Sequence, residues 1–456
     1  MPAPNHHTGA ACAEQLPPLV QDAWMTEVVP QLPTDLAAQA RVLKAFQRTR
    51  GLACPTDLLR ALLAYVLCAP SFRRLGAWAV LLGVADLSET AWRKRLAAAN
   101  LWLLWLLTEL LSPPPAPTGL LAGRCTRILL IDATRLRQPG GTGDDWRLHT
   151  AYDLVAGRLT HVTLTDRHTA ESLAHYALQA GDIVIADGGY GYRRSVATVV
   201  QQQADGVFRI HPSTFPAEDA AGQPIDVLRW LRRQGGVVRS RPAWCCWNGQ
   251  RYAVRLIAAK LPSTQARAAR KRKRQQAKDH GRPITLATLL IAGWVLLVTT
   301  LAADAWSDTE VLQLYRARWQ TELVYKRMKQ GLKLNQIRSI QRVQVEATVR
   351  LLLIAWALQE GEAARVRAVL PRGLPTATWG SQPTVVSSWL LTGLCLETLR
   401  QQVQGHWTQA RLRECLPRLQ RFLCSRLRRR GHQETEVRAW LAGREPHPGI
   451  QQQKAA

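Results

Sequence analysis

The residues best suited to chemistry lie at regular intervals between positions 315 and 329. Tyr315 is followed at distances of three, seven and fourteen residues by Arg318, Glu322 and Lys329. On a helix that turns roughly 100° per residue, these four side chains share about 60° of arc. A different and largely apolar face is formed by Ala317, Thr321, Val324, Met328 and Leu332. Taken alone, the stretch fits a solvated surface better, because Arg318 and Lys326 lie four residues either side of Glu322 and would pair with it.

Two further carboxylates end short apolar runs upstream. Asp132 closes the run RILLID at 127–132, and Asp187 closes the run DIVIAD at 182–187. Runs of this length and composition are typical of buried strands. Either aspartate alone could simply begin a turn. If the two strands are parallel neighbours, both carboxylates emerge at the same edge of the sheet, where Glu322 can supply a third.

Three carboxylates gathered in this way would repel one another and raise each other's pKa. A divalent cation removes that cost, and a site made only of oxygen ligands favours Mg²⁺ or Mn²⁺. Two such ions roughly 4 Å apart activate a nucleophile and stabilise the leaving oxygen in phosphoryl transfer. The three residues therefore indicate a metal-dependent enzyme that cuts a phosphodiester.

The charge of the chain points to a polyanionic partner. Of 456 residues, 60 are Lys or Arg and 33 are Asp or Glu, which leaves a net charge of +27. Most of the basic residues are arginines, whose planar guanidinium suits phosphate. A strongly basic balance indicates nucleic-acid binding first. Binding to an anionic membrane, or the compositional bias of an arginine-rich genome, would explain the same number.

The cysteines and the N-terminus bear on compartment. Nine cysteines are scattered without a CxxC pair or a Cys/His spacing typical of zinc. Free thiols fit a reducing cytoplasm, and the N-terminus lacks the basic and apolar sections of a secretory signal. The uncharged run Thr285–Ala303 is long enough to span a membrane, but its β-branched residues favour a buried strand after a short helical turn. We therefore expect a cytoplasmic protein with no membrane partner.

The N-terminal part of the chain is predicted to be helical. After a flexible segment at 1–34, apolar periodicity predicts five helices within a domain at 35–118: Asp35–Arg48, Pro55–Leu67, Phe72–Leu82, Ser88–Ala97 and Leu101–Leu111. The third and fourth resemble a helix-turn-helix in which Gly83 makes the turn and Ser88 caps the second helix. The residues that would face DNA are Trp92, Arg93, Lys94 and Arg95. An ordinary helical bundle explains the pattern equally well.

Beyond a proline-rich boundary at 113–117, the period of the sequence changes. Strands are predicted at Arg127–Asp132, Trp146–Leu154, Arg158–Asp166, Asp182–Asp187 and Val207–Ile210, with helices at Ala170–Leu178 and Arg193–Gln203. This order is that of a ribonuclease-H-like fold, an α/β fold whose mixed sheet places the first and fourth strands side by side. We assign 119–210 to the first part of a catalytic core.

The remaining chain is predicted to hold an insertion, the rest of the core and a helical region. Residues 211–284 form a β-rich insertion that ends in a basic run at 266–278, either solvated and disordered or a flexible arm that contacts phosphates. Residues 285–340 complete the core with a strand around Trp294–Leu301 and one long helix, Asp304–Gln336. A C-terminal helical region at 341–444 precedes a disordered tail at 445–456; its helices are expected at Val343–Glu362 and at about 385–403, 408–429 and 433–442.

The spacing Tyr315-x2-Arg318-x3-Glu322-x6-Lys329 resembles the YREK signature of the DDE transposases of bacterial insertion sequences, of the insertion-sequence-4 type. IDAT at 131–134 is similar to the first-aspartate motif of that family, and DGGY at 187–190 to the second. LHTAYDL at 148–154 and the TD…AE pattern at Asp166 and Glu171 also resemble it. The resemblance covers about 120–340.

The resemblance implies a role for each matching residue. Asp132, Asp187 and Glu322 would be the catalytic metal ligands. Contacts with transposon-end DNA would come from Tyr315, Arg318, Lys329 and Lys326, and from Tyr190 against a flipped base.

The resulting hypothesis is a transposase that uses Mg²⁺ or Mn²⁺, with two ions in each active site. It would bind the terminal inverted repeats of its element as a homodimer, cut the ends and join the freed 3′-hydroxyls to target DNA. The alternative is a non-catalytic DNA-binding regulator on a transposase-derived scaffold. The intact set of three carboxylates argues against that alternative.

Overall fold

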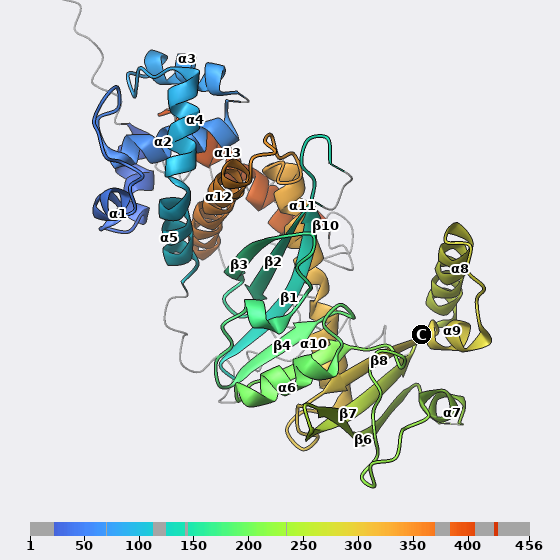
Figure 1. Cartoon of the computed structure of the whole chain (residues 1–456). Coiled ribbons are helices and arrows are strands. Elements are labelled where there is room, and N and C mark those ends of the chain that lie inside the picture. Colours follow the sequence, from blue (N-terminus) through green and yellow to red (C-terminus); the bar gives the residue numbers. More distant parts are fainter. Residues whose placement is uncertain are drawn as a thin grey trace, which may run out of the picture.

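An eight-stranded mixed sheet forms the centre of the catalytic half of the protein (Figure 1). The computed structural model describes residues 22–69, 71–112, 125–141, 145–233, 235–369, 384–405 and 424–426. The strands are β1 (Arg127–Leu136), β2 (Trp146–Asp153), β3 (Arg158–Asp166), β4 (Asp182–Ala186), β5 (Asp205–Arg209), β6 (Val238–Trp247), β7 (Gln250–Lys260) and β8 (Trp294–Thr299). Their order in the sheet is β3-β2-β1-β4-β5-β8-β7-β6.

The strand order confirms the predicted ribonuclease-H-like arrangement. The antiparallel strands β1, β2 and β3 form a meander, and β1 pairs in parallel with β4. The last pair of that parallel ladder is Ile131 with Ala186. The predicted hairpin between β2 and β3 turns at Gly157, whose φ of 69° is adopted most readily by glycine.

The predicted β-rich insertion belongs to the same sheet rather than forming a separate unit. Strand β7 pairs with β8 from Arg255–Thr299 to Lys260–Trp294, and β6 then forms the outer edge. Helix α7 (Val227–Arg232) precedes β6, and helices α8 (Ser263–Asp279) and α9 (Leu286–Ile291) lie between β7 and β8. The basic run at 266–278 is therefore helical, which corrects the expectation of a disordered or flexible segment. Its alanines, arginines, lysines and glutamines are strong helix formers.

Two helix predictions within the core are wrong. The segment 304–336 forms two helices, α10 (Asp308–Ala317) and α11 (Trp319–Gly331), that meet at Arg318. At the junction the backbone hydrogen bonds run from residue i to i−3, from Arg318 to Tyr315 and from Thr321 to Arg318, a tighter turn than an α-helix. The segment 170–178 holds only a 3-10 turn at Leu173–His175, because Tyr176 is extended and reaches inward.

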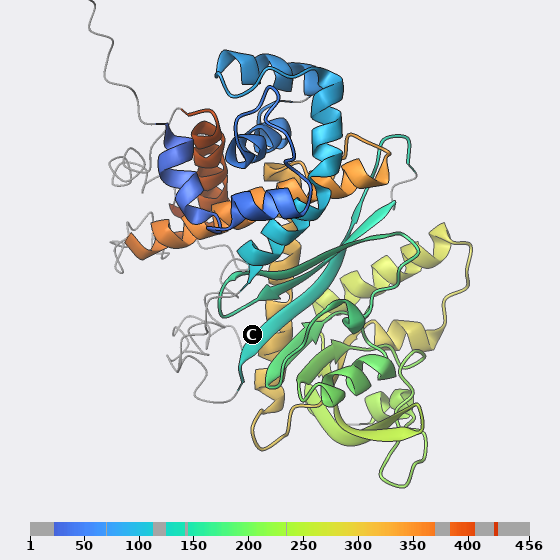
Figure 2. The same cartoon turned by 60° about the vertical axis from the view of Figure 1, so that its left-hand side comes forward.

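Helices cover both faces of the sheet. One face carries helix α6 (Arg193–Gln201), α7 and α9. The other packs against α10, α11, α5 (Asn100–Leu111) and the long helix α12 (Arg342–Val369). Figure 2 shows the orange α12 passing below the blue N-terminal helices and the red-brown α13 (Ser388–Val403), and α12 contacts both α2 (Pro55–Leu67) and α13. Helical regions from the two ends of the chain therefore share one core.

The remaining N-terminal helices are α1 (Leu36–Val42), α2 (Pro55–Leu67), α3 (Phe72–Leu81) and α4 (Glu89–Ala98), after short turns at Trp24–Val28 and Val29–Gln31. Helix α1 ends earlier than predicted, where Lys44 adopts a φ of 59°. Gly83 turns between α3 and α4 with a φ of 65°, and Ser88 caps α4 by accepting from the amide of Ala91. Trp92 is 0% exposed and packs in the core, so it cannot face DNA as predicted.

Two C-terminal predictions fall partly or wholly outside the described residues. Within the helix predicted at 408–429, only β10 (Cys424–Arg426) is described, and it forms a strand paired with β9 (Thr384–Val386). The predicted helix at 433–442, the segment 1–21 and the tail at 445–456 lie outside the described residues. Across the described ranges, no helix has both the length and the apolar content needed to cross a membrane.

Candidate active site

Asp132 and Asp187 lie side by side at the end of the parallel ladder. Each is the first residue beyond the Ile131–Ala186 pair, so both carboxylates emerge at the same edge of the sheet. Strand β4 ends there as predicted. Strand β1 does not end at Asp132: it continues to Leu136 because β2 goes on pairing with it, from Thr150 to Trp146.

Asp132 is held by three donors. One carboxylate oxygen, Oδ2, accepts from Arg318 Nη1 at 3.3 Å and from Thr321 Oγ1 at 3.1 Å, and Oδ1 accepts from the amide of Ala133 at 2.8 Å. Burial, with a smaller contribution from the charge of Asp187, raises the pKa of Asp132 to about 6, against the opposing effect of Arg318. The carboxylate is thus desolvated beside a second one, as expected where a cation is to bind.

Arg318 connects Asp132 to Glu322. It stands at the junction of α10 and α11, and its Nη2 donates to Glu322 Oε1 at 2.9 Å while Nη1 contacts Asp132. The planar guanidinium can bridge two carboxylates in this way because its donors point in fixed directions. All three predicted carboxylates therefore lie at one end of the sheet, with a guanidinium between two of them.

A fourth carboxylate, Glu171, lies beside Asp187. A Cβ placed on Gly189 would be 2.0 Å from Glu171 Oε2 and 3.0 Å from Asp187 Oδ1, so both oxygens border the same glycine. The amide of Gly189 donates to Asp187 Oδ1 at 2.8 Å. Burial and then Asp187 raise the pKa of Glu171, while Arg147, 4.0 Å away, opposes the shift. Its nearness to Asp187 was not predicted, although the TD…AE pattern marked the residue.

The other polar residues considered on α10 and α11 differ in their exposure and in their contacts. Lys329 Nζ donates to Thr134 Oγ1 of β1 at 2.7 Å, which ties α11 to the IDAT motif. Tyr315 is half-buried, and burial raises its pKa. Lys326 is exposed and lies 5.3 Å over the ring of Trp319 instead of pairing with Glu322. Sequence periodicity placed Thr321 on the apolar face, yet its hydroxyl contacts Asp132 because that face meets β1.

Tyr190 does not lie where a base could reach it. The residue is 0% exposed, and its hydroxyl shares a 3.1 Å hydrogen bond with that of Tyr176. The hydroxyl of Tyr176 donates in turn to the carbonyl of Asp132. Tyr190 was predicted either to contact a flipped base or to be a stacked core tyrosine, and its burial favours the core tyrosine.

The donor set fits a divalent cation. It consists of carboxylate oxygens, which Mg²⁺ and Mn²⁺ prefer, and the positive guanidinium of Arg318 already bridges two of them. Among the described residues, no three Asp, Glu, His or Cys side chains already converge on one point. Asp132, Asp187 and Glu322 supply carboxylate oxygens that such an ion could use, and Arg318 now stands between Asp132 and Glu322.

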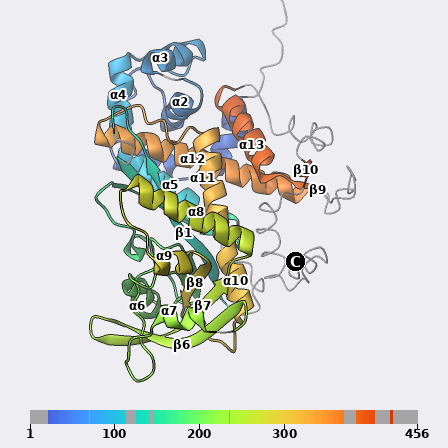
Figure 3. The same cartoon turned by 90° about the vertical axis from the view of Figure 1, so that its right-hand side faces the viewer.

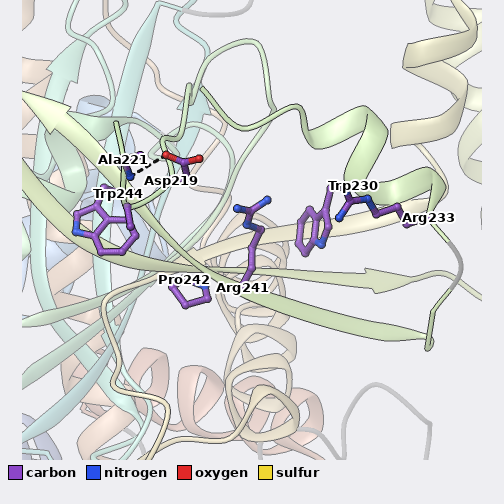
Figure 4. A pocket seen from close by; sticks show the side chains of 8 residues that line it. Asp219, Ala221, Trp230, Arg233, Arg241, Pro242 and Trp244 are labelled. Atoms are coloured by element: carbon purple, nitrogen blue, oxygen red, sulfur yellow. Dashed lines mark hydrogen bonds between the residues drawn. The ribbon is translucent and has the colours of Figure 1, made fainter. Parts of the chain in front are cut away.

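A separate open cavity lies elsewhere, beside β6 at the far edge of the sheet. It has a volume of about 630 Å³, and Figure 4 shows Trp230, Arg241 and Trp244 along its open floor. Its one acidic residue, Asp219, accepts from the amides of Ala221 and Gln223 in its own loop. Because this cavity lacks a set of catalytic groups, we assign the chemistry to the carboxylate edge.

A mixed sheet of this order, with acidic residues where β1 and β4 stop pairing, defines a ribonuclease-H-like phosphoryl-transfer domain. The family model for the transposase DDE domain matches residues 123–358. The chain is 35% identical over 314 residues to InsL of insertion sequence element IS186A from Escherichia coli K12, which covers 67% of this chain and 84% of that relative. Identity to the transposase for insertion sequence element IS421 from Escherichia coli is 35% over 318 residues, with the same shares.

The chain therefore belongs to the DDE transposases of bacterial insertion sequences. As a member of this family it is a DNA-cutting enzyme that acts on transposon DNA. The family also implies the use of a divalent metal ion.

Proposed function

We propose that Asp132, Asp187 and Glu322 are the catalytic metal ligands, and that Mg²⁺ or Mn²⁺ fills the site with two ions. The observation that supports this most directly is the position of the two aspartates immediately beyond the last parallel pair of β1 and β4. Glu322 is linked to them through Arg318. When bound, a pair of such ions supplies an activated nucleophile and stabilises the leaving oxygen.

The chain's own residues prepare the carboxylates and hold the DNA. Thr321 and the amide of Ala133 orient Asp132, and the amide of Gly189 orients Asp187. In the DNA-free protein Arg318 neutralises Asp132 and Glu322. As DNA binds, Arg318 exchanges these carboxylates for a phosphate of the transposon end, the exchange expected of a guanidinium.

The remaining contacts follow the YREK signature. Lys329 and Tyr315 would hold the same phosphate region, and exposed Lys326 would reach the neighbouring backbone. We propose the boundaries 1–34, 35–118, 119–210, 211–284, 285–340, 341–444 and 445–456 as divisions of the sequence only, because the insertion shares the sheet of the core and Trp24 and Val28 pack in the same core as both helical regions. The helical domain at 35–118 would bind the terminal inverted repeats through exposed Arg93 and Lys94. Two copies would pair in the complex that joins the ends to target DNA.

Substitution of each carboxylate tests the assignment. Asp132→Asn, Asp187→Asn and Glu322→Gln should each lower cleavage of DNA carrying the element's ends by roughly a thousandfold or more. Binding of the same DNA should persist, because each change removes a negative charge. Asp304→Asn, an exposed carboxylate outside the site, is the control and should cut normally. Full activity in any one of the three would remove that residue from the proposed site.

The same assay separates the enzyme from a non-catalytic regulator. The transposase should nick or cut end-bearing DNA in Mg²⁺ or Mn²⁺ and should be inactive in EDTA. Tight, sequence-specific binding by the unaltered protein, with no cleavage in either ion, would favour the regulator.

A further inference from the structure

Helix α8 rises from the same edge of the sheet as the catalytic carboxylates. Strand β5 runs parallel to β4 and ends at Arg209, opposite Leu297 of β8. Strand β8 begins beyond that point at Trp294, opposite Lys260, where β7 ends. The chain between β7 and β8 therefore leaves the sheet at the edge where β4 and β5 end. Figure 1 shows α8 standing clear of the sheet with α9 at its foot, and in Figure 3 it lies in front of α11.

One side of α8 fixes the helix to the protein. Ala266 is buried, and Arg270 Nε donates to the carbonyl of Leu289 at 3.1 Å, which joins α8 to the helix beside it. Burial, and then the charge of Lys273 on the same side of α8, lower the pKa of His211. His211 follows β5, which ends at the same edge of the sheet as β4.

An adjoining face of α8, about 100° round the helix from Ala266, carries a regular row of cations, here named the α8 stripe: Arg267, Lys271, Arg274 and Lys278. Their spacing of four, three and four residues keeps all four within about 60° of arc. All are exposed. At 1.5 Å per residue, the row is roughly 16 Å long.

The α8 stripe has no internal counter-charge. The one acidic residue of α8 is Asp279, and its carboxylate accepts from Gln275 at 2.7 Å. Across the described ranges, no carboxylate forms a salt bridge with a cation of the stripe. Like charges four residues apart destabilise a helix by about 0.2–0.5 kcal/mol for each pair. A helix that keeps such a row is suited to an extended anionic partner.

We propose that the α8 stripe binds consecutive phosphates of duplex DNA next to the active site, independently of base sequence. This inference rests on the proposed function, because DNA bound at the carboxylates of Asp132 and Asp187 would also pass α8. A row of charged side chains on one rigid helix follows a phosphate backbone, and phosphate contacts position DNA without reading its sequence. The duplex could be the transposon end or the target, since both offer the same phosphates.

The test compares the stripe with its matched neighbour on the same helix. A variant with all four stripe residues changed to alanine, the single variant Lys271→Ala and the control Arg272→Ala are measured by fluorescence anisotropy over a range of salt concentrations. Arg272 is exposed but lies about 100° away from Lys271, off the stripe. The probes are a duplex with the element's terminal repeat, an unrelated duplex of equal length, and phosphatidylserine vesicles.

The four-residue variant should bind both duplexes on the order of 10- to 100-fold more weakly, with a salt slope reduced by about 3 to 4. Lys271→Ala should reduce the slope by about 1, and Arg272→Ala by clearly less. Alanine is the best helix former, so circular dichroism should show intact helix in every variant.

Several results would overturn the proposal. These are unchanged DNA binding, equal effects of Lys271→Ala and Arg272→Ala, a loss confined to the terminal repeat, or a loss confined to vesicles. If the unaltered protein binds neither duplex, the proposed function fails. If it binds both and the four-residue variant binds equally well, only the assignment of the stripe fails.

Discussion

At the scale of single residues, the site depends on how little room surrounds its carboxylates. Asp132 is desolvated between Arg318, Thr321 and its own strand, and burial is the largest cause of its raised pKa. On the other side, Asp187 and Glu171 both border Gly189, where an added Cβ would collide with Glu171 Oε2 and make a tight 3.0 Å contact with Asp187 Oδ1. The absence of a side chain at Gly189, the second glycine of the DGGY motif, therefore leaves space for these carboxylates.

Gly189→Ala tests this crowding. The added methyl group would lie 2.0 Å from Glu171 Oε2, so Glu171 must move and Asp187 must adjust. Because Glu171 Oε2 is the far end of a flexible side chain that can move aside, we expect only a small loss of stability but slower cleavage of end-bearing DNA. Urea denaturation and a cleavage time course measure the two effects.

Gly188→Ala is the matched control for that change. Its added Cβ would meet only the carbonyl of Arg209, at 3.9 Å, which is an ordinary contact. This variant should fold and cut nearly as well as the unaltered protein. Equal behaviour of the two alanine variants would show that space at Gly189 is not what the site requires.

Some residues of the site could be predicted from sequence and others could not. Asp132 and Asp187 were accessible because apolar runs mark strands, and carboxylates at their ends meet when the strands are parallel. Thr321 was assigned to the apolar face, since periodicity shows that a face is covered but not what covers it. Glu171 was placed on a helix, although its segment is held extended by the inward-facing Tyr176.

At the scale of secondary structure, the junction at Arg318 decides the geometry. Both flanking helices share one apolar period, and Arg318 itself has helical dihedral angles (φ −50°, ψ −31°), so no capping signal in the sequence marks the break. The junction is stabilised by contacts made at a distance. Arg318 is fixed to Asp132 of β1, and Lys329 is fixed to Thr134 of the same strand.

Arg318→Lys tests the importance of the two-sided contact. Lysine keeps the charge but has a single ammonium group, which cannot bridge Asp132 and Glu322 as a guanidinium does. We expect the free energy of unfolding to fall by about 1–2 kcal/mol, because one charge-assisted hydrogen bond is lost. Arg316→Lys makes the same exchange at an exposed position two residues earlier and should be neutral. Matching denaturation midpoints for the two variants would contradict the bridge.

At the scale of the whole molecule, segments far apart in sequence form one helical layer. Arg60 of α2 donates to Asp22 at 2.6 Å and to the carbonyl of Val403 at 2.8 Å, which connects the N-terminal turns to the end of α13. Sequence periodicity predicted most of these helices individually. It could not predict their partners, because an apolar face does not specify which other apolar face it will meet.

The interface between this helical layer and the sheet contains a desolvated carboxyl group whose pKa is raised. Glu360 of α12 accepts from the amide of Leu159 in β3 at 3.3 Å. Desolvation raises its pKa from 4.5 to about 7, against the opposing charges of Arg327 and Arg158. Because the folded-state pKa lies above the unfolded value, the stability contributed by the protonated carboxyl is complete below pH 4.5 and is lost as the pH rises to about 7.

Glu360→Gln should therefore stabilise the protein in a pH-dependent way. Glutamine resembles the protonated acid and cannot ionise, so the variant should exceed the unaltered protein by up to about 3 kcal/mol at pH 8. The difference should shrink steadily between pH 7 and 4.5 and vanish below it. Urea denaturation at several pH values measures this difference in the free energy of unfolding. The control is Glu89→Gln, which changes an exposed glutamate that forms a salt bridge with Arg93. A pH-independent difference, or lower stability of Glu360→Gln at pH 8, would show that the charged form of Glu360 is tolerated at this interface.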